Sequence, residues 1–347
     1  MNNQKYWAIR ADQRMRNYMT KAEREYNTVA KAFRAASSEM EAEAKRVFQN
    51  FVQYSGVNEN EARRLLQNVK EGPVRGQLRK IAYRIADPQK RQELLNIVSA
   101  PAYSYRLRRW DDLKNSIDQW LQYLRENLLQ QTNALLNTLL REAYYRSVFE
   151  VQHRTGIGFS FSLLPESRVQ QIMGYKWSGE HYSARIWANT NELAAILKRE
   201  LLTGFLTGRS YAKTAKRIQH AMSSGSMQAK RLICTEANYI ANQGELEGYR
   251  ASGVKWYIYS ATLDLRTSEI CRRLDGKRYR VEEAQPGSNY PPMHPWCRST
   301  TVAYFSDSLL KQMQRSARDP ESGNIIRVPG NMSYSEWYRE YVEKRGT

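Results

Sequence analysis

The sequence has no long uninterrupted apolar segment, and it is poor in cysteine. No run of about 18 apolar residues occurs, so a membrane-spanning helix is not predicted. The segment from Met1 to Trp7 lacks the apolar core of a secretory signal peptide. Three cysteines in 347 residues exclude a disulfide-stabilised scaffold and suit a reducing compartment. We therefore expect a protein that is made in the cytoplasm and is soluble there.

Acidic residues are too few to balance the basic ones. The chain has 54 Lys and Arg against 35 Asp and Glu, which gives a formal net charge of +19. The positive excess lies in both halves of the chain. A surface of this kind favours contact with polyanions such as nucleic acid, an acidic protein or a membrane surface. The alternative is a helical protein whose charges only solvate its surface.

Helical periodicity dominates the first half. Apolar residues recur every 3 or 4 positions from Met15 to Phe51, which predicts one helix over roughly residues 11–54. A stripe of Leu and Trp predicts a second long helix over about 107–154, and two or three short helices are expected within 58–99. Helices of this length gain most of their stability from packing, so we expect a helical hairpin or bundle, or contact with another subunit.

The second half shows shorter elements. The segment Thr155-Gly-Ile-Gly158 marks a boundary. Helices are predicted over 191–202 and, after a cap at Ser210, up to a short linker at 223–226. A further helix over 227–251 precedes strands at 254–260 and 299–305. The remaining residues are expected to form a polar loop and a short helix near 334–344.

The predicted fold class is mainly α with a small α+β domain. The expected divisions are a long-helix N-terminal arm (1–155), an α+β domain (156–305) and a C-terminal tail (306–347).

The helical period breaks between residues 260 and 298, where two of the three cysteines and one of the four histidines gather. We call Cys271, His294 and Cys297 the Cys/His knuckle. Thiolates and imidazoles are the usual zinc ligands, and a structural site needs four. Asp264, Cys234 or His181 would have to supply the fourth. The alternatives are a metal-free knuckle held by packing and hydrogen bonds, and a disulfide between the two cysteines.

Other residues of this stretch are expected to be architectural. Asp264 and Thr267 are suited to hold loop N–H groups, and Arg266 is expected to pair with a carboxylate. Arg298 is expected to have a similar structural role rather than to contact a phosphate. A hairpin is predicted around Gly276, and the pair Pro291-Pro292 is expected to brace the loop. His294 and Cys297 also resemble a base and a nucleophile, but nothing in the sequence would orient them, so no catalytic role is expected.

A concentrated group of basic residues lies shortly before this stretch. Phosphate contact with DNA needs only such charge, without base readout. A solvated helix face is the alternative. The candidate nucleic-acid-binding residues are Lys213, Lys216, Arg217, Lys230 and Arg231.

The residues of this stretch resemble the signature of the Mu F-like phage head morphogenesis proteins, which are minor capsid proteins of tailed bacteriophages. The resemblance is carried by Asp264-Leu-Arg-Thr267, by Cys271 and Leu274-Asp-Gly-Lys277, and by Pro291-Pro-x-His294-Pro-x-Cys297-Arg298. Weaker agreement comes from Lys5-Tyr-Trp7 with Arg10, from Gly208-Arg-Ser210, and from Tyr334-Ser-Glu-Trp337.

The resemblance implies a low-copy virion protein of the head interior or portal vertex, made in the host cytoplasm. It would act in head morphogenesis, bind the portal and other head proteins, self-associate through its long helices, and contact packaged double-stranded DNA or aid its ejection. Many relatives carry cysteine where this chain has Ser268 and Ser299, which weakens the case for a metal site. The alternatives are a stand-alone basic nucleic-acid-binding protein and a nuclease or toxin-like enzyme.

Overall fold

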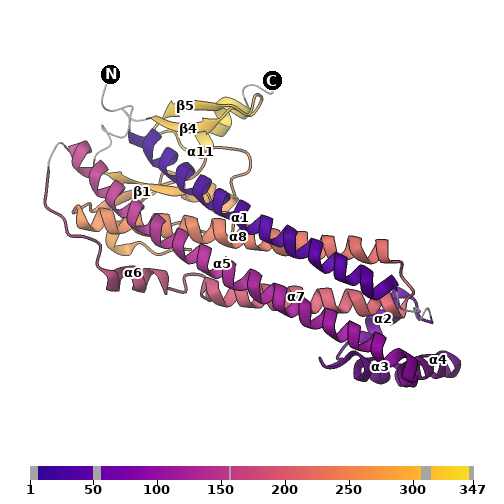
Figure 1. Ribbon diagram of the computed structural model, residues 1–347. Helices are drawn as coiled ribbons and strands as arrows, with labels where there is room; N and C mark the ends of the chain where they lie inside the picture. Colours follow the sequence, from indigo (N-terminus) through magenta and orange to yellow (C-terminus); the bar gives the residue numbers. More distant parts are fainter. Residues whose placement is uncertain (1–6, 50–55, 156–157, 306–313, 344–347) are drawn as a thin grey trace. The chain divides into compact units, whose positions relative to one another are not determined.

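The computed structural model describes residues 7–49, 56–155, 158–305 and 314–343. The protein is mainly α-helical, as the sequence predicts, and it has two small antiparallel sheets (Figure 1). Among the described residues, no helix combines the length and the apolar character that crossing a membrane requires. Lys5, Tyr6, Ser55 and the glycine-isoleucine pair at 156–157 lie outside the described residues.

Eight helices precede the first strand in the described chain. They are α1 (Trp7–Gln49), α2 (Glu59–Leu66), α3 (Val74–Ala82), α4 (Pro88–Ser99), α5 (Pro101–Thr155), α6 (Glu166–Met173), α7 (Tyr182–Leu206) and α8 (Tyr211–Ala251). Both long helices predicted for the first half are present as α1 and α5. The three short helices α2 to α4 lie between them in the sequence. Asp87 begins α4 by accepting hydrogen bonds from the backbone N–H groups of Gln89 and Lys90.

The chain forms two compact units, each built from segments that are distant in the sequence. Unit 1 contains residues 1–26, 130–182 and 230–347, and unit 2 contains residues 27–129 and 183–229. The divisions near residues 155 and 305 stay a prediction, because both units interleave segments from several parts of the chain.

Unit 1 is organised around parts of α1, α5 and α8 that pack closely together. Arg14 is buried and donates two hydrogen bonds to the Glu245 carboxylate, at 2.9 and 3.1 Å. Arg14 also forms an ion pair with Glu150 on α5. At Gly244 the backbones of α8 and α5 approach so closely that a Cβ atom on residue 244 would lie 2.5 Å from the Leu140 carbonyl oxygen. The apolar periodicity and this glycine together produce a tightly packed helical core.

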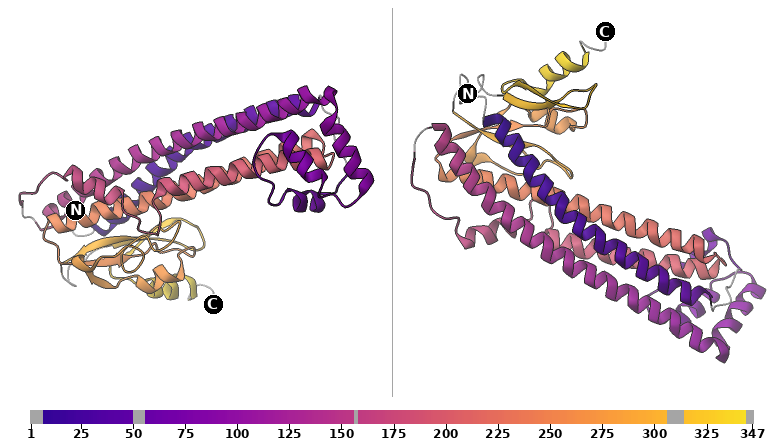
Figure 2. Two further views of the ribbon diagram at one scale, coloured as in Figure 1. Left: turned by 90° about the horizontal axis from the view of Figure 1, so that it is seen from below. Right: turned by 45° about the horizontal axis from the view of Figure 1, so that its top comes forward.

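Unit 2 is wholly helical in its described residues. Its core contains an aromatic cluster in which Trp110 contacts Phe48 and Phe205, with ring centroids 5.1 and 5.8 Å apart. Figure 2 shows α3 and α4 beside the first turns of α5. Val74 at the start of α3 donates its N–H to Asp111 of α5 at 2.7 Å, which anchors that helix.

The strands follow α8 and belong to unit 1. The remaining elements are β1 (Trp256–Ser260), α9 (Glu269–Leu274), β2 (Arg278–Arg280), a 3-10 turn (Val281–Glu283), β3 (Thr300–Tyr304), β4 (Gln314–Arg318), β5 (Ile325–Pro329), α11 (Tyr334–Tyr338) and a π-helical turn (Arg339–Glu343). The first sheet has the order β2-β1-β3, and β4 pairs with β5 in a second sheet. The inner face of the first sheet contributes Tyr257 and Ala303 to a core with Leu246 and Tyr249 of α8.

Three local predictions are wrong. The expected linker at 223–226 lies inside α8, where Gly225 approaches Leu193 so closely that a Cβ atom would be 2.7 Å from its Cδ2. The hairpin expected at Gly276 is absent, since α9 separates β1 from β2 and the turn leads from α9 into β2. The described part of the tail contains the β4–β5 pair in addition to its helix. In each case tertiary packing overrides a local polar or glycine signal.

Candidate functional site

The Cys/His knuckle is assembled by two segments that meet beside the end of β1. Cys271 lies in α9, and Ser268 caps that helix by accepting a hydrogen bond from the Cys271 backbone N–H. His294 and Cys297 lie in the loop that leads into β3. The structure therefore brings together the three residues that the sequence singled out, although 23 positions separate Cys271 from His294.

A tight turn sets the relative positions of His294 and Cys297. The Cys297 N–H donates to the His294 carbonyl at 3.1 Å, and Trp296 adopts a φ of 64°. Proline at the second position and a positive φ at the third are the signature of a type II turn, which usually has glycine at the third position. The Trp296 N–H is held by Thr235 Oγ1 of α8 at 3.1 Å. The helix thus supports a strained turn that a tryptophan would not favour by itself.

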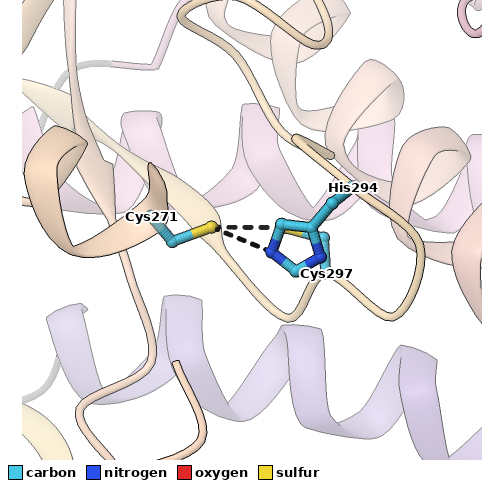
Figure 3. A group of neighbouring side chains, drawn as sticks. All are labelled: Cys271, His294 and Cys297. Atoms are coloured by element: carbon cyan, nitrogen blue, oxygen red, sulfur yellow. Dashed lines mark hydrogen bonds between the residues drawn. The ribbon is translucent and has the colours of Figure 1, made fainter. Parts of the chain in front are cut away.

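The three side chains point toward one another (Figure 3). The Cys271 sulfur lies 3.8 Å from the Cys297 sulfur and 3.4 Å from His294 Nε2, and all three donor atoms lie within 4.8 Å of one another. In a tetrahedral zinc site, bonds of about 2.3 Å to sulfur and 2.0–2.1 Å to nitrogen place two sulfurs about 3.8 Å apart and sulfur and nitrogen about 3.5 Å apart. Two edges of the cluster therefore match a zinc tetrahedron.

The histidine ring has the tautomer that a metal ligand needs. His294 Nδ1 lies 2.7 Å from the Pro295 carbonyl oxygen, which can only accept, so Nδ1 carries the proton. Nε2 is then an acceptor facing Cys271 and the Ser268 hydroxyl, which lies 2.7 Å away. A backbone carbonyl that orients the imidazole in this way is typical of zinc sites.

The two buried thiols differ in acidity. Hydrogen bonds to Cys271, first from Cys297 and then from Ser268, Ser299 and Tyr259, outweigh burial and lower the pKa of Cys271 to about 4. The same contact and burial raise the pKa of Cys297 well above its ordinary value. Tyr259 donates to the Cys271 sulfur at 3.2 Å. The pair thus stabilises one thiolate, which is the form of cysteine that binds metal.

The fourth donors that the sequence suggested lie elsewhere. The Asp264 carboxylate is paired with Arg298. Cys234 is buried within α8, and burial raises the pKa of its thiol to about 11. His181 contacts the Met173 carbonyl oxygen. Among the described residues, this cluster brings three His, Cys, Asp or Glu donors together. The hydroxyl groups of Ser268 and Tyr259 also contact the cluster, at His294 Nε2 and at the Cys271 sulfur. The donor set therefore fits three positions of a tetrahedral site.

The loop before α9 is organised by one buried carboxylate. Asp264 accepts from both terminal nitrogens of Arg298, at 2.5 and 2.8 Å, and from the Arg266 N–H and the Thr267 hydroxyl, at 3.0 and 3.1 Å. Hydrogen bonds from Arg298 and its positive charge hold the pKa of Asp264 below its ordinary value despite burial. These contacts tie the loop to the residue that follows Cys297.

Asp275 is an architectural residue that the sequence analysis missed. Its buried carboxylate accepts from both terminal nitrogens of Arg315 on β4, at 2.8 and 2.9 Å, and from the backbone N–H groups of Ala261 and Tyr334, at 2.8 Å each. Gly276 follows it with a φ of 77°, and the Pro291-Pro292 peptide bond is cis. The Asp-Gly pair signalled a turn, whereas the arginine partner lies 40 positions away and left no local signal.

The basic candidates all lie on α8, in two groups. Lys213, Lys216 and Arg217 are exposed in unit 2, and Arg217 is 3.7 Å from Glu59. Lys230 and Arg231 belong to unit 1, where Lys230 lies over the Tyr26 ring at 5.0 Å. The structure thus places the first group on exposed helix surface and engages Lys230 with an aromatic ring.

Residues 195–302 match the family described as Phage Mu protein F like protein. The chain is 24% identical over 220 residues to the NAD(+)–arginine ADP-ribosyltransferase EFV of Enterococcus faecalis, which covers 58% of this chain and 43% of that protein. It is 22% identical over 247 residues to the minor head protein GP7 of Bacillus phage SPP1, covering 65% of this chain and 79% of that protein.

The chain thus spans less than half the length of the Enterococcus protein and most of the length of the phage protein. No solved structure matches. The region matched by the family begins in α7 and ends in β3, and it contains the whole Cys/His knuckle. The chain is thus similar to the Phage Mu protein F-like family over residues 195–302, and to a phage minor head protein over 65% of its length.

Proposed function

We propose that the protein is a minor head protein that acts in phage head morphogenesis by binding the portal and other head proteins, without catalysing a reaction. The match to a minor head protein over 79% of that protein's length carries this proposal. The knuckle, in the region matched by the family, supplies a rigid structural element, and the helices supply surface for a partner.

Unit 2 offers a surface suited to such a partner. Tyr105 and Tyr123 of α5 are 62% and 60% exposed. They are 18 residues apart, which at about 100° per residue is five full turns, so both project from one face of the helix. Tyrosine is enriched at protein interfaces because it combines a large apolar ring with a polar tip. We assign this tyrosine face to contact with another head protein.

Sedimentation tests the proposal. The protein should pellet with phage heads or with purified portal rings, and the double variant Tyr105→Ser/Tyr123→Ser should pellet less. Tyr175, which is 55% exposed in unit 1, provides the control: Tyr175→Ser should pellet like the unmodified protein. A monomer that pellets with neither particle would contradict the proposal and favour a stand-alone nucleic-acid-binding protein.

DNA contact is the second part of the proposal. The net charge of +19 and the exposed basic residues of α8 support binding to phosphates without base readout. Such contact fits a protein of the head interior, where packaged double-stranded DNA is the abundant polyanion.

The knuckle is better suited to structure than to catalysis. Cys271 and Cys297 are 2% and 1% exposed, and this burial supports a structural role for the knuckle. A nucleophile must meet its substrate as well as its base. The similarity to an ADP-ribosyltransferase covers under half of that enzyme, and incubation with NAD+ and an arginine substrate should yield no transfer.

We further propose that Cys271, His294 and Cys297 hold one zinc ion. The match of two edges to a zinc tetrahedron, the thiolate character of Cys271 and the orientation of the imidazole support this. When bound, zinc supplies a structural crosslink between α9 and the loop before β3. Ser268 and Ser299 surround the site with hydroxyl groups in place of further thiols.

A further inference from the structure

An exposed row of cationic and aromatic side chains crosses the first sheet. Trp256 is the direct partner of Arg280 on β2 and of Tyr304 on β3, so all three project from the same face. Arg278 lies two positions from Arg280 and shares this face. The opposite face, with Tyr257, is packed into the core of unit 1. We call Trp256, Arg278, Arg280 and Tyr304 the sheet platform.

The platform combines π-faces with guanidinium groups. The Arg280 guanidinium carbon lies 5.2 Å from the centre of the Trp256 ring, and that of Arg278 lies 4.8 Å from the centre of the Tyr304 ring. Arg278 also donates to the Tyr304 hydroxyl at 2.7 Å. Trp256 is 40% exposed and the Arg280 side chain 53% exposed. These groups are therefore ordered by one another and remain open to solvent.

A recess of about 490 Å³ adjoins the platform, at the junction of β1 and β2 with the end of α8. Its wall includes Arg250, Lys255, Trp256 and Arg280. One carboxylate, that of Glu282, also lines it and accepts from Arg280 at 2.9 Å. Arg250 pairs with Glu247 and Arg280 pairs with Glu282, so Lys255 supplies a positive charge beyond these two ion pairs. This excess charge favours an anionic occupant, and the indole favours one with a flat aromatic group.

We propose that the sheet platform and its recess bind single-stranded nucleic acid, with a base stacked on Trp256 and phosphates on Lys255, Arg250 and Arg280. Aromatic side chains on a sheet with arginines alongside suit an unpaired strand, because every base presents a π-face and the backbone presents charge. The bases of a duplex are stacked on one another inside the double helix, so they are not available to stack on the Trp256 indole. The inference rests on the proposed DNA contact and locates a second site, distinct from the exposed group Lys213, Lys216 and Arg217 of α8.

Fluorescence anisotropy with a labelled thymidine oligonucleotide tests the proposal, with a hairpin of similar length that is paired except for a minimal loop as the comparison. The unmodified protein should bind the single strand at low salt, and Trp256→Leu should weaken that binding about tenfold while leaving hairpin binding unchanged. Lys255→Glu changes only an exposed side chain of the recess and should also weaken single-strand binding.

Trp187 provides a matched control. It is 49% exposed on α7 and has the Arg125 guanidinium carbon 3.6 Å from its ring centre, but it is a helical residue of unit 2. Trp187→Leu should bind both oligonucleotides like the unmodified protein. Unchanged single-strand binding by Trp256→Leu would overturn the platform while leaving the DNA contact of α8 standing. Absence of binding to either oligonucleotide would overturn both.

Discussion

Replacing Gly244 by alanine should destabilise the protein, although alanine is the better helix former. In an exposed helix interior the change would stabilise by about 1 kcal/mol. Here the new Cβ atom would lie 2.5 Å from the Leu140 carbonyl oxygen and 2.6 Å from Ala143 Cβ. Backbone atoms cannot rotate away as a flexible side chain can, so α5 and α8 must separate, and overpacking of this kind costs about 1–3 kcal/mol. The difference is a net loss of up to about 2 kcal/mol.

Urea denaturation followed by circular dichroism at the helical band measures this loss. Gly76 supplies the control, because it lies within α3 and a Cβ atom there would meet nothing within 4 Å. Gly76→Ala should therefore stabilise by about 0.5–1 kcal/mol. Gly225→Ala should have a smaller effect than Gly244→Ala, because its close contact is the end of the Leu193 side chain. If Gly244→Ala stabilises the protein as Gly76→Ala does, the close helix contact does not constrain the fold.

Three further predictions concern charge and metal. Arg168 pairs with Glu247 at 2.7 and 3.0 Å. Burial would raise the pKa of Glu247, but the hydrogen bonds and charges of Arg168 and Arg250 outweigh burial and lower it. The stability that the Glu247 carboxylate contributes is present above the ordinary glutamate pKa and is lost as pH falls through the lowered pKa, so Glu247→Gln should cost about 1.5 kcal/mol at pH 7 and reduce the loss of stability in acid, measured by denaturation at several pH values. Metal analysis of protein purified under reducing conditions should find close to one zinc per chain, greatly reduced in His294→Ala; a value near zero in the unmodified protein would end the zinc proposal. The affinity for duplex DNA should fall steeply between low and physiological salt, whatever the DNA sequence. The slope of affinity against salt should decrease when Lys213, Lys216 and Arg217 are neutralised together. A flat salt response would refute the proposed DNA contact.

Local patterns in the sequence determined the long helices of the first half and two strands of the first sheet. The apolar spacing of α1 and α5 is visible because each turn of a buried helix needs an apolar residue every 3 or 4 positions. The strands β1 and β3 were predicted from alternating and β-branched residues, within one or two positions of their observed ends. The three members of the Cys/His knuckle were likewise recognisable, because cysteine and histidine are rare in this chain.

Tertiary structure alone decided the features that depend on distant partners. Gly225 appeared to mark a linker, but its missing side chain lets α8 pass close to Leu193 and continue. Arg315 appeared to belong to a polar tail, but burial beside Asp275 makes it part of the framework that holds β4. The row formed by Trp256 with its neighbours exists only because strand register places opposite residues on one face. A sequence records which residues are present, whereas packing decides which of them meet.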